Sequence, residues 1–205
     1  MLVDLKVKDF VAQVASDSPA PGGGSVAALS ASLGAGLLSM LANLTAGKKG
    51  YEEVWTEMEK IAAKAKNAAD GFLKTIDDDT AAFNVYMDAI KMPKDTDEQK
   101  AARSAAMQAA AKGATNVPLQ LARDAFALFD TVEYAIRHGN KNATSDGAVA
   151  LVMLRSGVLA ALYNVRINLG GIKDEEFVKR VASEADGLEQ SVAGREGEIL
   201  KGVEL

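Results

Sequence analysis

Hydrophobic residues recur at helical spacing along almost the whole chain. Between Tyr51 and Met92 they follow alternating steps of three and four, which is typical of a helix packed along another helix. Similar stripes predict further helices over residues 8–15, 97–113, 116–138, 146–169 and 174–202. No segment shows the period-two alternation of a strand. The pattern predicts an all-α fold, a bundle of long helices in a single domain spanning residues 1–205.

One segment stands apart because it lacks charge. No charged residue occurs from Pro19 to Gly47, although 25% of all residues are charged. The segment opens with prolines and glycines that exclude regular structure, and Ser25 is the predicted N-cap of the helix that follows. That helix is apolar on nearly every side, so we expect it to be buried at the centre of the bundle. Lys48 and Lys49 end the uncharged run.

Two other interpretations of the uncharged segment are weaker. Its length is sufficient to cross a bilayer, but it contains five polar residues and no companion span is apparent. Gly22, Gly24 and Ala27 match a dinucleotide-binding spacing, but a Pro-Ala-Pro sequence replaces the strand that must precede it. We therefore expect a core helix whose glycine-rich N-terminus lets a ligand approach the backbone.

Composition narrows the chemistry further. The chain has no cysteine and a single histidine, which excludes disulfides, thiolate catalysis and a zinc or haem site. A net charge of −5 without a basic stripe argues against nucleic acid as a partner. The first residues resemble no signal peptide, so we expect a cytoplasmic protein without membrane partners.

The long 51–92 helix has one polar residue on its apolar stripe. Asp79 stands where a hydrophobic residue is expected, about 20° from Phe72 on a helical wheel, whereas Asp77 lies off the stripe. A buried carboxylate is costly unless it is paired or used. The alternative is an exposed helix break around residues 77–79.

The polar residues that packing does not explain form a short set of candidates. Carboxylates suit proton transfer or stabilisation of a cation, amides suit a hydrogen-bonding heterocycle, and lysines suit an acidic tail. Asp77 and Asp79 are the catalytic candidates. The predicted substrate-binding residues are Pro21, Gly22, Gly23, Gly24, Ser25, Lys48, Lys49, Asn140, Ser145, Asp146, Asn164 and Asn168.

Several of these residues stand in recognisable motifs: Ala20-Pro21-Gly22-Gly23-Gly24-Ser25-Val26, Leu44-Thr45-x-Gly47-Lys48-Lys49, Asp77-x-Asp79-x-x-Ala82-Phe83, Gly139-Asn140 with Ser145-Asp146, and Asn164-Val165-x-Ile167-Asn168-Leu169. In this order they resemble the formiminotetrahydrofolate cyclodeaminase and methenyltetrahydrofolate cyclohydrolase family. The resemblance covers about residues 10–189 and is to the short, free-standing members.

The resemblance implies a homodimeric enzyme that acts at the one-carbon bridge between N5 and N10 of tetrahydrofolate. It implies no cofactor beyond the reduced folate, with one glutamate or several, and no metal. The lysines would meet the glutamate tail, and the asparagines with the glycine backbone would contact the pterin. The family's proton-transfer aspartate aligns with Asp77, whereas the helical wheel favours Asp79, and Asp77 is narrowly preferred.

Two questions stay open at the level of sequence. The natural reaction is either hydrolysis of the methenyl bridge or cyclisation of a formimino group with loss of ammonia. The alternative class is a non-catalytic, folate- or small-ligand-binding helical dimer in which the aspartates and lysines only form ion pairs.

Overall fold

The structure is a computed structural model that describes residues 1–201 and 203. Helices account for its regular structure, and no strand occurs in this part of the chain. The prediction of an all-α protein is confirmed. The elements are η1 (Leu2–Asp4), α1 (Val7–Val14), α2 (Gly23–Asn43), η2 (Glu52–Val54), α3 (Trp55–Lys91), α4 (Asp97–Phe126), α5 (Phe129–His138), η3 (Lys141–Ala143), α6 (Thr144–Leu169) and α7 (Glu175–Leu200).

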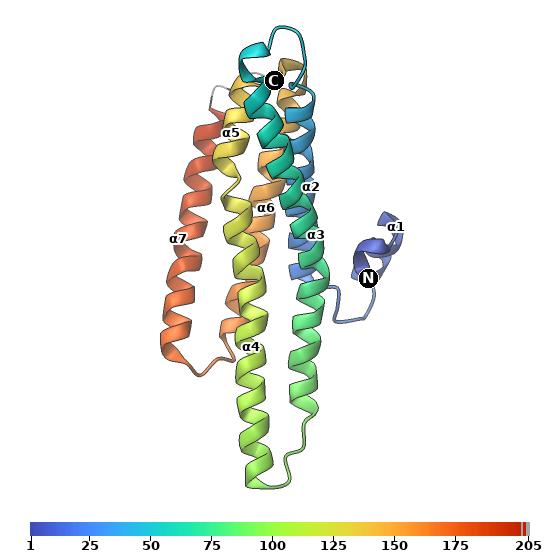
Figure 1. Cartoon of the computed structure of the whole chain (residues 1–205). Helices are drawn as coiled ribbons and strands as arrows, with labels where there is room; N and C mark the ends of the chain where they lie inside the picture. Colours follow the sequence, from blue (N-terminus) through green and yellow to red (C-terminus); the bar gives the residue numbers. More distant parts are fainter. Residues whose placement is uncertain (202, 204–205) are drawn as a thin grey trace.

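Helices α2, α3, α4, α6 and α7 lie side by side as a bundle, and α5 continues the line of α4 at the end away from the α3–α4 turn (Figure 1). Helices α3 and α4 continue beyond the others as a projecting hairpin, and α1 stands away from the bundle on the opposite edge to α7. The predicted end of the last helix, at Gly202, lies outside the described residues.

Helix α2 is the uncharged helix of the sequence, and twelve of its 21 residues are buried. It packs against α6 at very short range, because glycines lie where the two helices meet. A Cβ atom at Gly34 would lie 2.8 Å from the Ala150 carbonyl oxygen, and one at Gly157 would lie 2.9 Å from Ala31 Cβ. The small residues of both helices therefore set their separation.

The prediction that Ser25 caps this helix was wrong. The N-cap is Gly22, and Ser25 lies inside the first turn, fully buried. Its hydroxyl points at α3 instead, 3.0 Å from the Ile76 carbonyl oxygen. A serine near a helix start can bond to a neighbouring helix as well as to its own backbone.

Helix α3 runs without interruption through residues 77–79, so the alternative of an exposed break there was wrong. Its apolar stripe packs within the same chain, where Met58, Phe72 and Ile76 are buried. Phe83 and Tyr86, further along, are only half-buried. The stripe is thus covered by the bundle as far as Ile76.

The break between two predicted helices lies further along the chain than expected, between α4 and α5. The sequence suggested a break between Gly113 and Asn116, but one helix spans Asp97 to Phe126 with Pro118 inside it. A helical proline leaves the carbonyl four residues earlier without its usual N–H donor. That carbonyl belongs to Ala114, and the Asn168 side-chain amide of α6 donates to it at 2.9 Å. The neighbouring helix thus satisfies the group that the proline leaves free.

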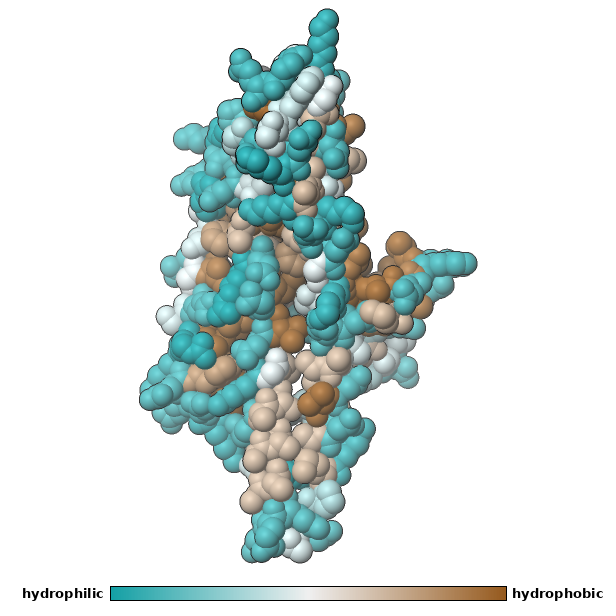
Figure 2. Space-filling model, in the orientation of Figure 1, coloured by the Kyte–Doolittle hydropathy of each residue, from teal (hydrophilic) through white to brown (hydrophobic). Residues whose placement is uncertain are grey.

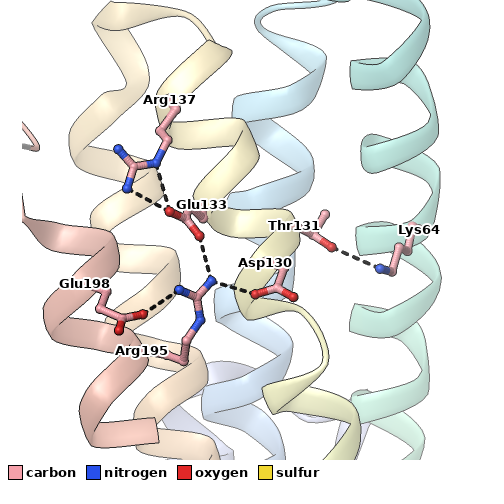
Figure 3. Close-up of polar contacts among 7 residues, drawn as sticks. All are labelled: Lys64, Asp130, Thr131, Glu133, Arg137, Arg195 and Glu198. Atoms are coloured by element: carbon pink, nitrogen blue, oxygen red, sulfur yellow. Dashed lines mark hydrogen bonds and ion pairs between the residues drawn. The ribbon is translucent and has the colours of Figure 1, made fainter. Parts of the chain in front are cut away.

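Ion pairs tie α7 to α5 at the end of the bundle away from the hairpin (Figure 3). Arg195 contacts Asp130 at 2.7 Å and Glu133 at 2.6 Å, and Arg137 shares Glu133. These arginines lower the pKa of Glu133. The groups are partly solvated, so each pair contributes at most about 1 kcal/mol to stability.

Two helices, not one, are long and apolar enough to cross a membrane: α2 and the segment Lys141–Leu169. The expectation that α2 has no such companion was therefore wrong. Core helices of soluble bundles have the same length and composition, and α2 and α6 pack on each other. The length and apolar composition of these two helices are therefore not evidence that they span a membrane. Figure 2 shows apolar side chains on the projecting α1, where Val7 and Val11 are exposed.

Candidate active site

A cavity of about 340 Å³ lies where the N-terminus of α2 meets α3, α4 and the C-terminal end of α6. The glycine loop, Asp79 and two asparagines, all predicted from sequence, line it together. The lining residues are Pro19, Ala20, Gly22, Gly23, Gly24, Asp79, Thr80, Phe83, Tyr86, Ala111, Ala114, Asn164, Ile167, Asn168 and Gly171.

Asp79 sits directly against the start of α2. A Cβ atom at position 24 would lie only 2.1 Å from Asp79 Oδ1, so only glycine leaves room for this carboxylate. Asp79 Oδ2 lies 3.1 Å from the Ser25 hydroxyl, which is shared with the Ile76 carbonyl. The partial positive charge at a helix N-terminus favours an anion in this place. The glycine motif therefore provides the space that the Asp79 carboxylate occupies.

Burial has the largest influence on the pKa of the Asp79 carboxyl group. Loss of solvent raises the pKa of Asp79, and the hydroxyl and backbone amide of Ser25 lower it by a smaller amount, so the pKa stays above the ordinary value. A raised pKa moves a carboxyl group toward the pH at which it can both accept and return a proton. Asp79 thus has the environment of a general acid–base group.

Asn164 and Asn168 present acceptors to the cavity. Asn164 Nδ2 donates to the Ala160 carbonyl at 2.8 Å, and Asn168 Nδ2 donates to Ala114. These bonds fix both amides, and among the described residues neither Oδ1 accepts a hydrogen bond. Position 23 is also close, since a Cβ there would lie 3.1 Å from Asn164 Nδ2. Two fixed carbonyl oxygens suit a ring edge that carries N–H donors.

Asp77 lies outside the cavity. Its Oδ1 accepts the backbone N–H of Leu2 at 2.7 Å, and its Oδ2 is buried without a hydrogen-bond partner. Asp77 therefore holds η1 against α3, two residues from Asp79 on a different side of the same helix. Asp78, between them, is half-exposed and pairs with Lys74 at 2.7 Å.

The other predicted substrate-binding residues cluster at the far end of α2. Lys48 Nζ donates to Asn140 Oδ1 at 2.6 Å, and the Asn140 amide group donates to the Leu44 carbonyl. Ser145 and Asp146 are in the first turn of α6, close to this end, and Lys49 is exposed. Helix α2 has 21 residues, so about 30 Å of helix separates this cluster from the glycine loop. One chain does not bring the two groups together.

Sequence reasoning missed several parts of the cavity wall. Tyr86 belonged only to the α3 stripe, Phe83 belonged to that stripe and to the motif that ends Ala82-Phe83, and Ala111 and Ala114 were not candidates. The signal that could have found the aromatic pair is their position, one and two turns after Asp79. Pro21 is buried and does not line the cavity. The described residues contain no group of three or more His, Cys, Asp or Glu side chains that could hold a metal ion.

The comparisons with known proteins agree with the geometry. A model of the formiminotransferase-cyclodeaminase family matches residues 6–187. The chain belongs to this family. The resemblance seen in the motifs is therefore confirmed.

Individual relatives in this family fall into two sizes. A methenyltetrahydrofolate cyclohydrolase from Methylorubrum extorquens is 40% identical over 182 residues, which cover 89% of this chain and 88% of the relative. The chicken formimidoyltransferase-cyclodeaminase is 40% identical over 176 residues, but this chain spans only 32% of its length. A solved formiminotetrahydrofolate cyclodeaminase from Thermotoga maritima is 31% identical, with a TM-score of 0.87 over 99% of this chain and 98% of that one.

Proposed function

We propose that this chain is a folate one-carbon enzyme that acts at the N5/N10 bridge of tetrahydrofolate. The Methylorubrum relative is named a methenyltetrahydrofolate cyclohydrolase, and the Thermotoga neighbour a formiminotetrahydrofolate cyclodeaminase. The observation in this chain that carries the proposal is the carboxylate of Asp79, partly buried at a cavity edge beside a helix N-terminus, with its pKa raised.

In the hydrolytic reaction, water adds to the methenyl carbon and gives a tetrahedral intermediate. Asp79 takes the proton from this water. N5 then receives this proton from Asp79 and the bond from carbon to N5 breaks. The hydroxyl proton of the intermediate passes to the carboxylate as the C=O bond forms, so the products are the 10-formyl compound and one proton. The ionised carboxylate also stabilises the cationic methenyl substrate before water adds.

In the deamination, Asp79 again first accepts a proton and then returns one. N10 attacks the carbon of the protonated formimino group on N5, whose nitrogen becomes an amino group, and Asp79 accepts the N10 proton. The carboxyl group then gives a proton to the departing nitrogen, which leaves as ammonia, and the methenyl bridge remains. Both reactions need one carboxyl group that alternates between its two protonation states, which is why a raised pKa is useful.

The remaining cavity groups orient the substrate. The free oxygens of Asn164 and Asn168 accept from the N–H groups of the pterin edge. Phe83 and Tyr86 supply aromatic faces on the wall of the cavity. No cofactor beyond the reduced folate enters either reaction, because each is a proton-coupled addition and elimination.

The function is tested by turnover of methenyltetrahydrofolate, followed spectrophotometrically with water or ammonia as the second reactant. We expect Asp79→Asn to lose more than about 100-fold in turnover, the contribution of a general acid–base group. The matched control is Asp78→Asn on the same helix, which should turn over normally. If the parent binds a reduced folate in titration calorimetry without turnover, the chain is a binding module; if Asp79→Asn turns over like the parent, Asp79 is not the proton-transfer group.

We also propose that the chain forms a homodimer through one apolar face. The α3 stripe does not supply this face, because the bundle covers it as far as Ile76. A larger set of exposed apolar side chains lies along α2 and α6 instead. We call them the α2–α6 face: Val26, Leu33, Met40, Leu44, Val149, Val152, Tyr163 and Ile167. Leu33 and Ile167 are 52% and 77% exposed, which favours a partner that covers them.

A further inference from the structure

The proposed reactions leave the hydroxyl group of Thr80 without a role. Thr80 follows Asp79 on α3, and both residues line the cavity. Each reaction also has a small second molecule, water that enters in the hydrolysis or ammonia that leaves in the deamination. Asp79 alone does not fix the orientation of this molecule, because a single hydrogen bond leaves it free to rotate. A second polar group beside Asp79 is therefore of interest.

The Thr80 hydroxyl departs from the usual behaviour of a threonine inside a helix. Such a hydroxyl commonly bonds to the carbonyl group four residues earlier in its own helix. Thr75, on the same helix, does so with Gly71 at 3.1 Å. For Thr80 this carbonyl belongs to Ile76, but the Ser25 hydroxyl of α2 donates to it at 3.0 Å. Ser25 thus takes the acceptor that Thr80 would otherwise use.

The hydrogen bond that Thr80 does make is with Ser25 itself. Among the described residues, the Thr80 hydroxyl has one hydrogen-bond neighbour, Ser25 Oγ at 3.4 Å. Ser25 is fully buried, and its single hydrogen is shared between the Ile76 carbonyl and Asp79 Oδ2. The hydrogen between the two hydroxyl groups must therefore come from Thr80. The Thr80 oxygen is left with lone pairs, and no hydrogen, for a molecule in the cavity.

The geometry points to Thr80 as the residue that holds the small second reactant, together with Asp79. Asp79 Oδ2 and Thr80 Oγ1 lie 3.1 and 3.4 Å from the same Ser25 oxygen, so one water-sized molecule can contact the carboxylate and the hydroxyl at once. Water has two hydrogens, and each of these groups is an acceptor for one of them. With both hydrogens held, a lone pair of the water is free to face the methenyl carbon.

This inference rests on the proposed function and extends it from the proton-transfer group to the place of the second reactant. In the hydrolysis, one water proton passes to Asp79 as the bond from oxygen to the methenyl carbon forms, and the cation becomes a neutral intermediate. Thr80 keeps its own hydrogen in the bond to Ser25 and only orients the water. In the deamination, the departing nitrogen occupies the same place, with its hydrogens directed at the same two acceptors.

Thr80→Val tests the inference, because valine has the shape of threonine without the hydroxyl group. In whichever of the two reactions the parent catalyses, kcat should fall by about tenfold or more, since the small reactant loses one hydrogen bond and its fixed orientation. The KM for the folate should not change, because Thr80 contacts the small reactant and not the folate. A parental kcat would overturn the inference, and so would a raised KM with an unchanged kcat.

Thr80→Ser and Thr80→Ala provide a second comparison, which does not depend on the folding of the valine variant. These two variants both lack the methyl group and differ only in the hydroxyl. The serine variant should keep most of the parental kcat, and the alanine variant should show the loss. Equal kcat values in the two variants would overturn the inference, because the hydroxyl would then have no effect on the rate.

Thr75→Val is the matched control on the same helix, since Thr75 bonds to its own backbone and does not line the cavity. It should keep the parental kcat, and a loss equal to that of Thr80→Val would assign the effect to the helix and overturn the inference. A parent without folate turnover would remove the proposed function itself. An active parent with an equally active Thr80→Val would remove only the role of Thr80, so the two failures are distinguishable.

Discussion

Gly24→Ala is the sharpest perturbation of this site, because it adds one methyl group at the point where Asp79 meets α2. The new Cβ would lie 2.1 Å from Asp79 Oδ1, 2.5 Å from Cγ and 2.7 Å from Oδ2. Real Cβ atoms essentially never approach within 3.0 Å, so the carboxylate oxygen has to move by about 0.9 Å. A displacement of about 1 Å in a reacting group can cost about 100-fold in rate.

The same substitution should change stability only slightly. Alanine in place of a helical glycine favours folding by about 1 kcal/mol. Displacement of Asp79 loses its hydrogen bond to Ser25, and a hydrogen bond to a charged group is worth about 1.5–3 kcal/mol. We therefore expect the free energy of unfolding to fall by about 0.5–2 kcal/mol while turnover falls by about 100-fold.

The assay combines turnover of methenyltetrahydrofolate with denaturant unfolding. Gly187→Ala is the matched control, because Gly187 is exposed on α7 with nothing within 4 Å of a Cβ. It should gain a little stability and keep its rate. If Gly24→Ala turns over like the parent, the close approach of Asp79 to α2 has no role in catalysis.

The remaining predictions concern the carboxylates and the lysines. Ser25→Ala removes a donor that lowers the pKa of Asp79, so the acidic limb of the pH profile of kcat/KM should move to higher pH; an unchanged limb would contradict this. Because the pKa of Asp79 is raised by folding, its ionisation destabilises the native state as pH rises through and above the ordinary value near 3.9. In urea unfolding, Asp79→Asn should therefore be at least as stable as the parent at neutral pH, and this advantage should shrink as pH falls toward that value. Asp77→Asn should keep its turnover and alter only the melting temperature, since Asp77 contacts the backbone of Leu2; a rate loss of about 100-fold would return the proton-transfer role to it. Lys48→Ala with Lys49→Ala should raise KM more for a polyglutamylated than for a monoglutamylated folate, with equal effects excluding tail binding; added salt should weaken the parental preference.

Much of this protein follows from its sequence alone. Helical periodicity over long segments predicted the all-α fold, since no segment with strand periodicity was left to form a sheet for these stripes to pack on. The absence of charge from residue 19 to 47 predicted a helix buried at the centre of the bundle. Twelve of the 21 residues of α2 are buried, but Val26, Leu33 and Met40 leave one side exposed. The break in the α3 stripe at Asp79 predicted a buried carboxylate, because a charge at an apolar position needs a reason.

The tertiary structure determined which residues of different helices meet, and the spacing of residues along the sequence does not encode this. Pro118 stands inside α4 because Asn168 from another helix satisfies the carbonyl that the proline leaves free. The Ser25 hydroxyl likewise donates to a distant residue, the Ile76 carbonyl of α3, which is 51 residues away in the sequence, and does not cap its own helix. The choice between Asp77 and Asp79 depends on which side of α3 meets the start of α2, and only the packed helices show that Asp79 is on the cavity side. Local propensity specifies the helices, whereas contacts between distant residues determine which polar groups share a site.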